Sequence, residues 1–290
     1  MSSDLPSTVT RRTALLLTTG IAVSGAFAGE TPVPEPADDT TTGASGIKLG
    51  VCTYSFREFS RSLALKMIRE LGVSYVSVKD VHLPYTLNPS EMEKAKAEFK
   101  KAGLTIVSVG NTDLKDEDPS VLRRYFEYAR NCGAPMIVAA PTHSTLPAVE
   151  KLAKEFNIQV AIHTHGPEDK NFPSPKVVLD AVRNMDPRMG LCMDVGHSMR
   201  AGADVVREIA NAGPRLLDMH MKDLKSGTDK DSQCEVGEGV MPVVAIFKQL
   251  KKIGYNGCVN LEYEIHSDSP IPGMQRSLGY MKGVLAGLAG

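Results

Sequence analysis

Short runs of β-branched and apolar residues alternate with longer amphipathic stretches from Lys48 to the end of the chain. This alternation is typical of parallel strands joined by crossover helices. The sequence contains eight such strand-like runs, at residues 49–53, 75–78, 105–109, 136–139, 159–163, 189–194, 216–220 and 258–262. An open doubly wound sheet usually stops at about five to seven strands, whereas eight strand–helix units close a parallel sheet into a barrel. The predicted fold is therefore α/β, a (β/α)8 TIM barrel.

Helical spacing of apolar residues supports this prediction. Residues 89–102 form the clearest predicted helix, with Asn88 as its N-terminal cap and Gly103 after its end. Similar patterns predict helices at residues 120–132, 146–156 and 242–253. No GxGxxG turn follows the first predicted strand, so a dinucleotide site has no support.

Composition and charge narrow the choice of partner. Of the 290 residues, 42% are hydrophobic and 23% charged, as in an ordinary globular protein. The formal net charge of −1 provides no general attraction to nucleic acid or to an anionic membrane, so a small ligand is expected. The five cysteines show no CxxC spacing and are predicted to be buried structural thiols.

The N-terminus carries the features of an export signal. Arg11 and Arg12 precede an apolar run at residues 14–27, and Ala-Phe-Ala at residues 26–28 has the small-x-small pattern of a cleavage site. Residues 1–28 are therefore predicted to be a twin-arginine-type signal peptide, which makes the protein periplasmic or extracellular. A short membrane anchor is the alternative, but the apolar run is shorter than the ~20 residues that span a bilayer.

A segment rich in Pro, Thr, Asp and Gly follows the signal, without apolar periodicity. Residues 29–46 are predicted to be a disordered linker, and residues 47–290 the barrel domain. No stable membrane insertion is expected after the signal is cleaved. The oligomeric state stays open, because an apolar helix face can cover the core or a second copy of the chain.

The positions of the histidines predict an active site. All of them end or follow a predicted strand, and none lies in a predicted helix: His82, His143, His163, His165, His197, His220 and His266. In a TIM barrel, the chemistry takes place at the C-terminal ends of the strands. The ends of the last four predicted strands supply imidazole or carboxylate ligands, and a mixture of the two suits Mn, Zn, Fe, Co or Ni rather than Ca. A hydrogen-bonded His/Asp/Glu network without a metal is the alternative.

Five short motifs lie in the second half of the chain: Asp194-Val195-Gly196-His197, His220-Met221-Lys222-Asp223, Gly237-Glu238-Gly239, Gly254-Tyr255-Asn256-Gly257 and Glu262-Tyr263-Glu264. In their order and strand placement, they resemble the xylose isomerase-like barrel superfamily, which includes ketose 3-epimerases and inosose dehydratase. The resemblance implies one divalent ion, Mn, Co, Zn or similar. Its implied ligands are Asp194, His220, Glu262 and a residue at the end of strand 5, with His197 as a substrate-binding neighbour.

Strand 5 departs from the family pattern. Epimerases place a glutamate there, whereas this chain has His163 and His165. His163 is expected to be the metal ligand from strand 5, and His165 is the second choice for this position. Glu168 could fold back to replace them as the ligand. Ketose epimerases use two opposed glutamates, so the loss of one makes a simple two-carboxylate epimerisation doubtful.

The resemblance implies a sugar isomerase/epimerase-like enzyme that acts on a small keto-sugar or related polyol through a metal-stabilised enediolate. A lyase or hydrolase using the same site is the alternative. The expected catalytic residues are Glu262, His165 and Lys222, and the expected substrate-binding residues are His197, Lys79, Glu168 and Tyr54. For Lys79, an ion pair with Asp80 at the rim of the barrel is as well supported as a contact with the substrate.

Two other classes of function fit the sequence less well. A metal-dependent endonuclease of the endonuclease IV type needs more ligands and a basic rim, and both the net charge and the export signal speak against it. A non-catalytic exported sugar-binding barrel would be expected to have lost ligands at strands 6 to 8, but all are present.

Overall fold

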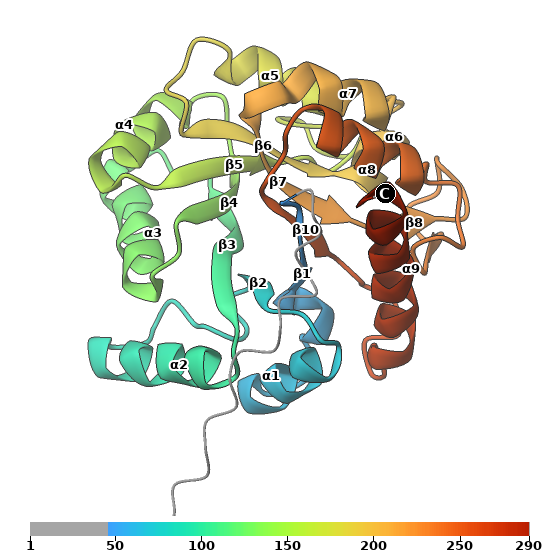
Figure 1. The fold of residues 1–290 in the computed structure, drawn as a ribbon. Helices are drawn as coiled ribbons and strands as arrows, with labels where there is room; N and C mark the ends of the chain where they lie inside the picture. The colour runs from blue at the N-terminus through green and yellow to red at the C-terminus, as the bar shows by residue number, and fades with distance from the viewer. Residues whose placement is uncertain (1–45, 290) are drawn as a thin grey trace, which may run out of the picture. The chain divides into compact units, whose positions relative to one another are not determined.

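The computed structural model describes residues 46–289. Eight parallel strands close into a barrel in the order β1-β10-β7-β6-β5-β4-β3-β2, as predicted (Figure 1). The barrel strands are β1 (Lys48–Cys52), β2 (Tyr75–Val78), β3 (Thr105–Leu114), β4 (Met136–Pro141), β5 (Gln159–His163), β6 (Met189–Asp194), β7 (Leu216–Met221) and β10 (Cys258–Leu261). The predicted signal peptide and most of the predicted linker lie outside the described residues.

Helices surround the barrel on its outer side (Figure 1). They are α1 (Arg61–Glu70), α2 (Pro89–Lys101), α3 (Pro119–Cys132), α4 (Leu146–Phe156), α5 (Pro175–Val182), α6 (Val195–Arg200), α7 (Val205–Ala212), α8 (Val243–Lys252) and α9 (Ile271–Ala289). In α2, the side chain of Asn88 accepts from the amide of Glu91, whose carboxylate accepts in return from the amide of Asn88. This capping box fixes the start of the helix that the sequence predicted.

Alternate side chains along each barrel strand point either outward, toward the helices, or inward, into the barrel. Side chains that point outward from the strands pack under the helices in one large apolar core, which includes Met219 and Met221 of β7. The alternate side chains point into the barrel, and on β7 these are Asp218 and His220. Four predicted ligand positions therefore share the inner face, each at or directly after the C-terminal end of its strand.

The structure differs from the predicted elements in the loops after the strands. Strand β3 runs five residues beyond the predicted end at residue 109, and β10 ends at Leu261, so that Glu262 follows the strand. Two short antiparallel strands, β8 (Asp223–Leu224) and β9 (Gln233–Cys234), form a small sheet between β7 and α8. All five cysteines are free and buried, as predicted. Among residues 46–289, no helix combines the length and apolar character needed to cross a membrane.

Candidate active site

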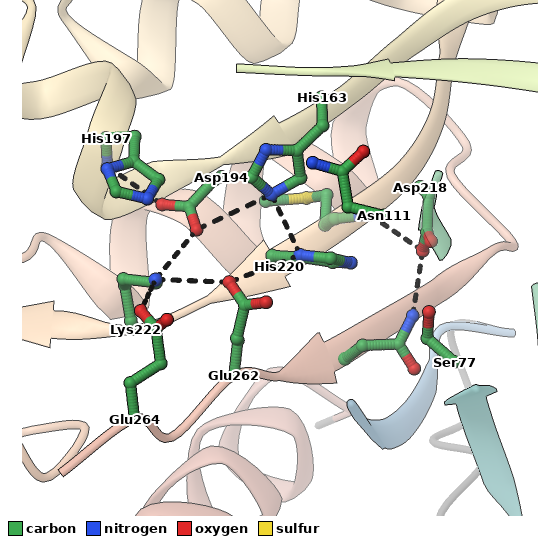
Figure 2. Close-up of polar contacts among 12 residues, drawn as sticks. Ser77, Asn111, His163, Asp194, His197, Asp218, His220, Lys222, Glu262 and Glu264 are labelled. Carbon is green, nitrogen blue, oxygen red and sulfur yellow. Dashed lines mark hydrogen bonds and ion pairs between the residues drawn. The ribbon is translucent and has the colours of Figure 1, made fainter. Parts of the chain in front are cut away.

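The residues predicted to bind a metal converge at the C-terminal mouth of the barrel (Figure 2). One candidate ligand atom from each of His163, Asp194, His220 and Glu262 lies within 4.8 Å of the others. His163 Nε2 is 3.0 Å from His220 Nδ1 and 3.8 Å from Asp194 Oδ2, and His220 Nδ1 is 3.4 Å from Glu262 Oε2. Two imidazole nitrogens and two carboxylates thus face one small volume.

Burial and neighbouring charges favour the metal-binding forms of His163 and Glu262. Burial, together with the neighbouring imidazoles, holds the pKa of His163 well below its usual value, so the ring is neutral near pH 7. Burial alone would raise the pKa of Glu262, but Lys222 and His220 hold it well below the usual range. A neutral imidazole and an ionised carboxylate are the forms that bind metal. For His220, burial alone would lower the pKa, but neighbouring groups raise it well above its usual value, so binding of a metal there would release a proton.

The buried residues fit a transition-metal ion. His163 Nε2 and His220 Nδ1 face each other, and within the described part of the chain the buried Asp194 Oδ2 forms an ion pair with Lys222 but no hydrogen bond. Mixed nitrogen and oxygen donors suit Mn, Co, Zn or Fe.

Lys222 lies at the centre of an acidic cluster (Figure 2). Its Nζ is 3.1 Å from Asp194 Oδ2, 3.1 Å from Glu262 Oε2 and 2.6 Å from Glu264 Oε2. Burial alone would lower the pKa of Lys222, but the three carboxylates raise it well above its usual value. The aliphatic stem packs on Gly196, where a Cβ would lie 2.6 Å from Lys222 Cγ. The buried ammonium is therefore held charged and in place.

His165 lies beside the cluster rather than in it. Its Nε2 is 2.6 Å from Asn111 Nδ2, and its Nδ1 is 3.3 Å from Asp169 Oδ2. Burial lowers the pKa of His165, and the nearby Asp169 offsets part of this effect. Lys79 donates from Nζ to the carbonyl of Asn111 at 2.5 Å and lies 3.3 Å from Asp80, so it contacts both the site and the rim.

A cavity of about 260 Å³ opens above these residues. The cavity is lined by four of the predicted residues, Tyr54, Lys79, His165 and His197, and by three members of the ligand cluster. Its full lining is Cys52, Tyr54, Ser77, Lys79, Gly110, Asn111, His163, His165, His197, His220, Glu262 and Glu264. The lining is rich in hydrogen-bonding groups and its volume suits a small polar molecule.

Glu168 does not reach this cavity. Among the described residues, Glu168 forms an ion pair with Arg200, and its side chain is 59% exposed. Arg200 in turn donates to His197 Nδ1 at 3.0 Å. Glu168 therefore lies outside the ligand cluster and contacts the pocket residue His197 only through Arg200.

The histidines divide into two groups. His163, His165, His197 and His220 line the cavity, whereas His82, His143 and His266 lie outside it. His197 lies in α6, a short helix that the sequence did not predict. The reason is that the carboxylate of Asp194, at the end of β6, accepts from the amide of His197 and caps α6 there.

Three residues of the site were missed by the sequence analysis. Glu264 was noted only as part of a motif, Asn111 follows the predicted end of its strand, and Asp169 lies in a loop. Only the spacing of Glu264, two residues after Glu262, could have indicated that both carboxylates lie near the barrel mouth.

Comparison with known proteins gives three related curated sequences. The chain is 26% identical over 211 residues to an uncharacterized protein of Methanocaldococcus jannaschii, which covers 68% of each chain. It is 24% identical over 202 residues to a probable endonuclease 4 of Mycoplasmopsis pulmonis, covering 60% of this chain and 63% of that protein. It is 23% identical over 229 residues to 3-oxo-isoapionate decarboxylase of Pectobacterium atrosepticum, covering 70% of this chain and 80% of that protein.

Solved structures share the fold. The probable 3-DHS dehydratase of Bacillus anthracis aligns with a TM-score of 0.67 at 16% identity, over 81% of this chain and 98% of that one. D-psicose 3-epimerase of Clostridium cellulolyticum H10 aligns with a TM-score of 0.67 at 18% identity, over 81% and 98%. At these identities the likeness concerns the barrel.

The family assignment rests on a longer match. The sequence model of the xylose isomerase-like TIM barrel family matches residues 65–284, from α1 to α9. This range includes the ligand cluster, Lys222 and the cavity lining apart from Cys52 and Tyr54. The chain belongs to the xylose isomerase-like TIM barrel family.

Proposed function

We propose that this protein is a metal-dependent enzyme that moves a proton next to the carbonyl of a small keto-sugar or related polyol. The observation that carries the proposal is the cluster of His163, Asp194, His220 and Glu262 below a polar cavity of about 260 Å³. Epimerases and a dehydratase among proteins of the same fold support this class of substrate and reaction.

The charges of the cluster support a divalent ion. Asp194, Glu262 and Glu264 carry three negative charges, and the ammonium of Lys222 neutralises one of them. The three carboxylates outnumber the one ammonium, and this excess favours a cation at the cluster, since buried charge without compensation is costly. Such an ion would supply Lewis acidity, which polarises a carbonyl and stabilises negative charge on its oxygen.

The protein's own groups would move the proton. A neutral His165 that donates from Nδ1 to Asp169 keeps its lone pair on Nε2, where Asn111 now lies. That nitrogen is placed to accept a proton from a substrate in the cavity. Lys222 is placed to donate to a substrate oxygen that becomes negative. An imidazole base opposite a carboxylate and an ammonium supports isomerisation or elimination more than epimerisation by two glutamates.

Metal content is the first measurement. Elemental analysis of the purified protein is expected to find about one transition-metal equivalent, which Asp194→Ala and His220→Ala each remove. Asp268→Ala removes an exposed carboxylate after β10. It is the matched control, and this variant is expected to keep the ion. Keto-sugars are then incubated in D₂O with the loaded protein, and NMR follows deuterium entering next to the carbonyl.

Absence of bound metal, together with no affinity for Mn²⁺, Co²⁺ or Zn²⁺ on titration, would contradict the proposal. A non-catalytic sugar-binding barrel would then be the better reading. Metal binding without exchange or turnover of any keto-sugar would support the site but not the reaction.

A further inference from the structure

Lys222 contacts the same oxygens that would bind the ion. Asp194 Oδ2 lies 3.8 Å from His163 Nε2 and 3.1 Å from Lys222 Nζ. Glu262 Oε2 lies 3.4 Å from His220 Nδ1 and 3.1 Å from Lys222 Nζ. Each of these carboxylate oxygens therefore faces a candidate ligand nitrogen on one side and the ammonium on the other.

Such an arrangement cannot persist unchanged when a metal binds. Metal–carboxylate distances are about 2.0–2.2 Å, so an ion held by both oxygens would lie close to the ammonium and repel it. The side chain of Lys222 is 4% exposed and its stem packs on Gly196, which leaves it little room to swing into water. The displaced charge needs a carboxylate that is not a ligand.

Glu264 is that carboxylate. Its Oε2 lies 2.6 Å from Lys222 Nζ, nearer than either of the other two carboxylates, and it lies outside the four-residue ligand cluster. Gln233 holds the backbone on both sides of Tyr263, since its Nε2 donates to the carbonyl of Glu262 and its Oε1 accepts from the amide of Glu264. The local backbone thus directs Glu262 and Glu264 to the same ammonium.

We propose that Lys222 is a built-in cation that occupies the acidic cluster of the metal-free protein, and that Glu264 retains it beside the metal once Asp194 and Glu262 become ligands. This inference rests on the proposed function. Lys222 then weakens metal binding by competing for two ligands, whereas Glu264 strengthens it by drawing the ammonium aside. Glu264 is accordingly a positioning residue that acts through Lys222.

The test is a double-mutant cycle with Mn²⁺ as the probe. Affinity is measured by calorimetry on chelator-stripped wild type, Lys222→Met, Glu264→Gln and the double variant. Lys222→Met is expected to bind Mn²⁺ more tightly and Glu264→Gln less tightly, each on the order of tenfold, because the coupling passes through one direct contact. In the Lys222→Met background, Glu264→Gln is expected to change the affinity by less than about threefold.

Controls separate this result from loss of structure. Glu58→Gln, which removes an exposed carboxylate, is expected to leave the affinity at the wild-type value, and circular dichroism of each metal-free variant checks folding. A merely structural role predicts that both single variants bind Mn²⁺ more weakly. That result, or an equal loss with Glu264→Gln in both backgrounds, would overturn the inference while leaving the metal site intact. If the wild type binds no divalent metal, the proposed function and this inference both fail.

Discussion

Asp218 is a buried carboxylate inside the barrel, two residues before the candidate ligand His220 (Figure 2). It accepts from Asn260 Nδ2 at 2.9 Å, from the amide of Met219 at 2.9 Å and from the hydroxyl of Ser108 at 3.3 Å. Burial nevertheless outweighs these hydrogen bonds and raises the pKa of Asp218 to about 6. The folded protein therefore holds this proton at pH values at which the unfolded chain has released it.

This shift predicts how Asp218→Asn changes the pH dependence of stability. The stabilisation from the raised pKa is present below the ordinary value of 3.8 and is lost as the pH rises to about 6. The amide cannot ionise, so the free energy of unfolding of Asp218→Asn relative to wild type should increase from about pH 4 to pH 7, by up to roughly 3 kcal/mol. Urea unfolding at several pH values measures this difference.

Asp268→Asn, which changes an exposed carboxyl, serves as the control and should show a flat difference. A flat difference for Asp218→Asn as well would mean that Asp218 is ionised in the folded protein, despite its burial.

Strand-end periodicity explains which site residues could be predicted. His163, Asp194, His220 and Glu262 share the inner face at the ends of neighbouring strands, so their meeting follows from the barrel topology. The partner of Lys222 could not be chosen in the same way, because several acidic residues follow the same strands. The contact between Lys222 and Glu264 depends on the backbone conformation after β10. Hydrogen bonds with Gln233 of β9 hold this backbone in place.

At the scale of elements, one carboxylate organises the loop between β7 and α8. Asp223 accepts from the amides of Leu224 and Met241 through Oδ1, and from the amides of Gly237 and Gly239 through Oδ2. A Cβ on Gly239 would lie 2.2 Å from Asp223 Oδ1, so this close approach requires glycine. Two of the sequence motifs, at residues 220–223 and 237–239, are therefore halves of one structural unit.

Asp223→Asn is expected to destabilise the protein by roughly 3 kcal/mol. The side chain is fully buried, and either orientation of the amide would turn an NH₂ group toward two backbone N–H donors. Chemical denaturation measures the loss, and hydrogen exchange should locate faster opening at residues 225–241. Asp231→Asn, in the same loop but exposed, provides the comparison. A loss below about 1 kcal/mol would show that the loop keeps its fold without this carboxylate.

The barrel strands and the helices α2, α3, α4 and α8 were predicted, because each repeats an apolar pattern over several turns or pleats. No bounds were predicted for α1, α5, α7 and α9. The helix α6 and the sheet of β8 and β9 were not predicted. With six residues, α6 is too short to show a period, and its start depends on the cap from Asp194. The small sheet depends on Asp223, whose partners lie up to 18 residues away.

At the scale of the whole molecule, charged side chains gather at the mouth of the barrel although the net charge is small. The formal net charge is −1, yet three carboxylates and one ammonium meet at the mouth of the barrel. All five cysteines are buried thiols, so the described fold needs no oxidising compartment. A barrel without disulfides is compatible with folding in a reducing cytoplasm, which agrees with the predicted export by a pathway that carries folded proteins.

Arg11 and Arg12 are accordingly expected to direct export by the twin-arginine pathway. In a bacterial host that has this pathway, changing both to lysine should leave full-length precursor in the cytoplasm, because the receptor reads the arginine pair rather than its charge. Cell fractionation and the size of the protein on a gel measure the outcome. Arg123 and Arg124 of α3 form a matched pair inside the folded domain.

Changing Arg123 and Arg124 to lysine keeps the same charge and should leave export at the wild-type level. Normal export of the signal variant would contradict the twin-arginine prediction and indicate a route that does not read this pair. Wild-type protein that keeps its full length in the membrane fraction would instead favour the short anchor.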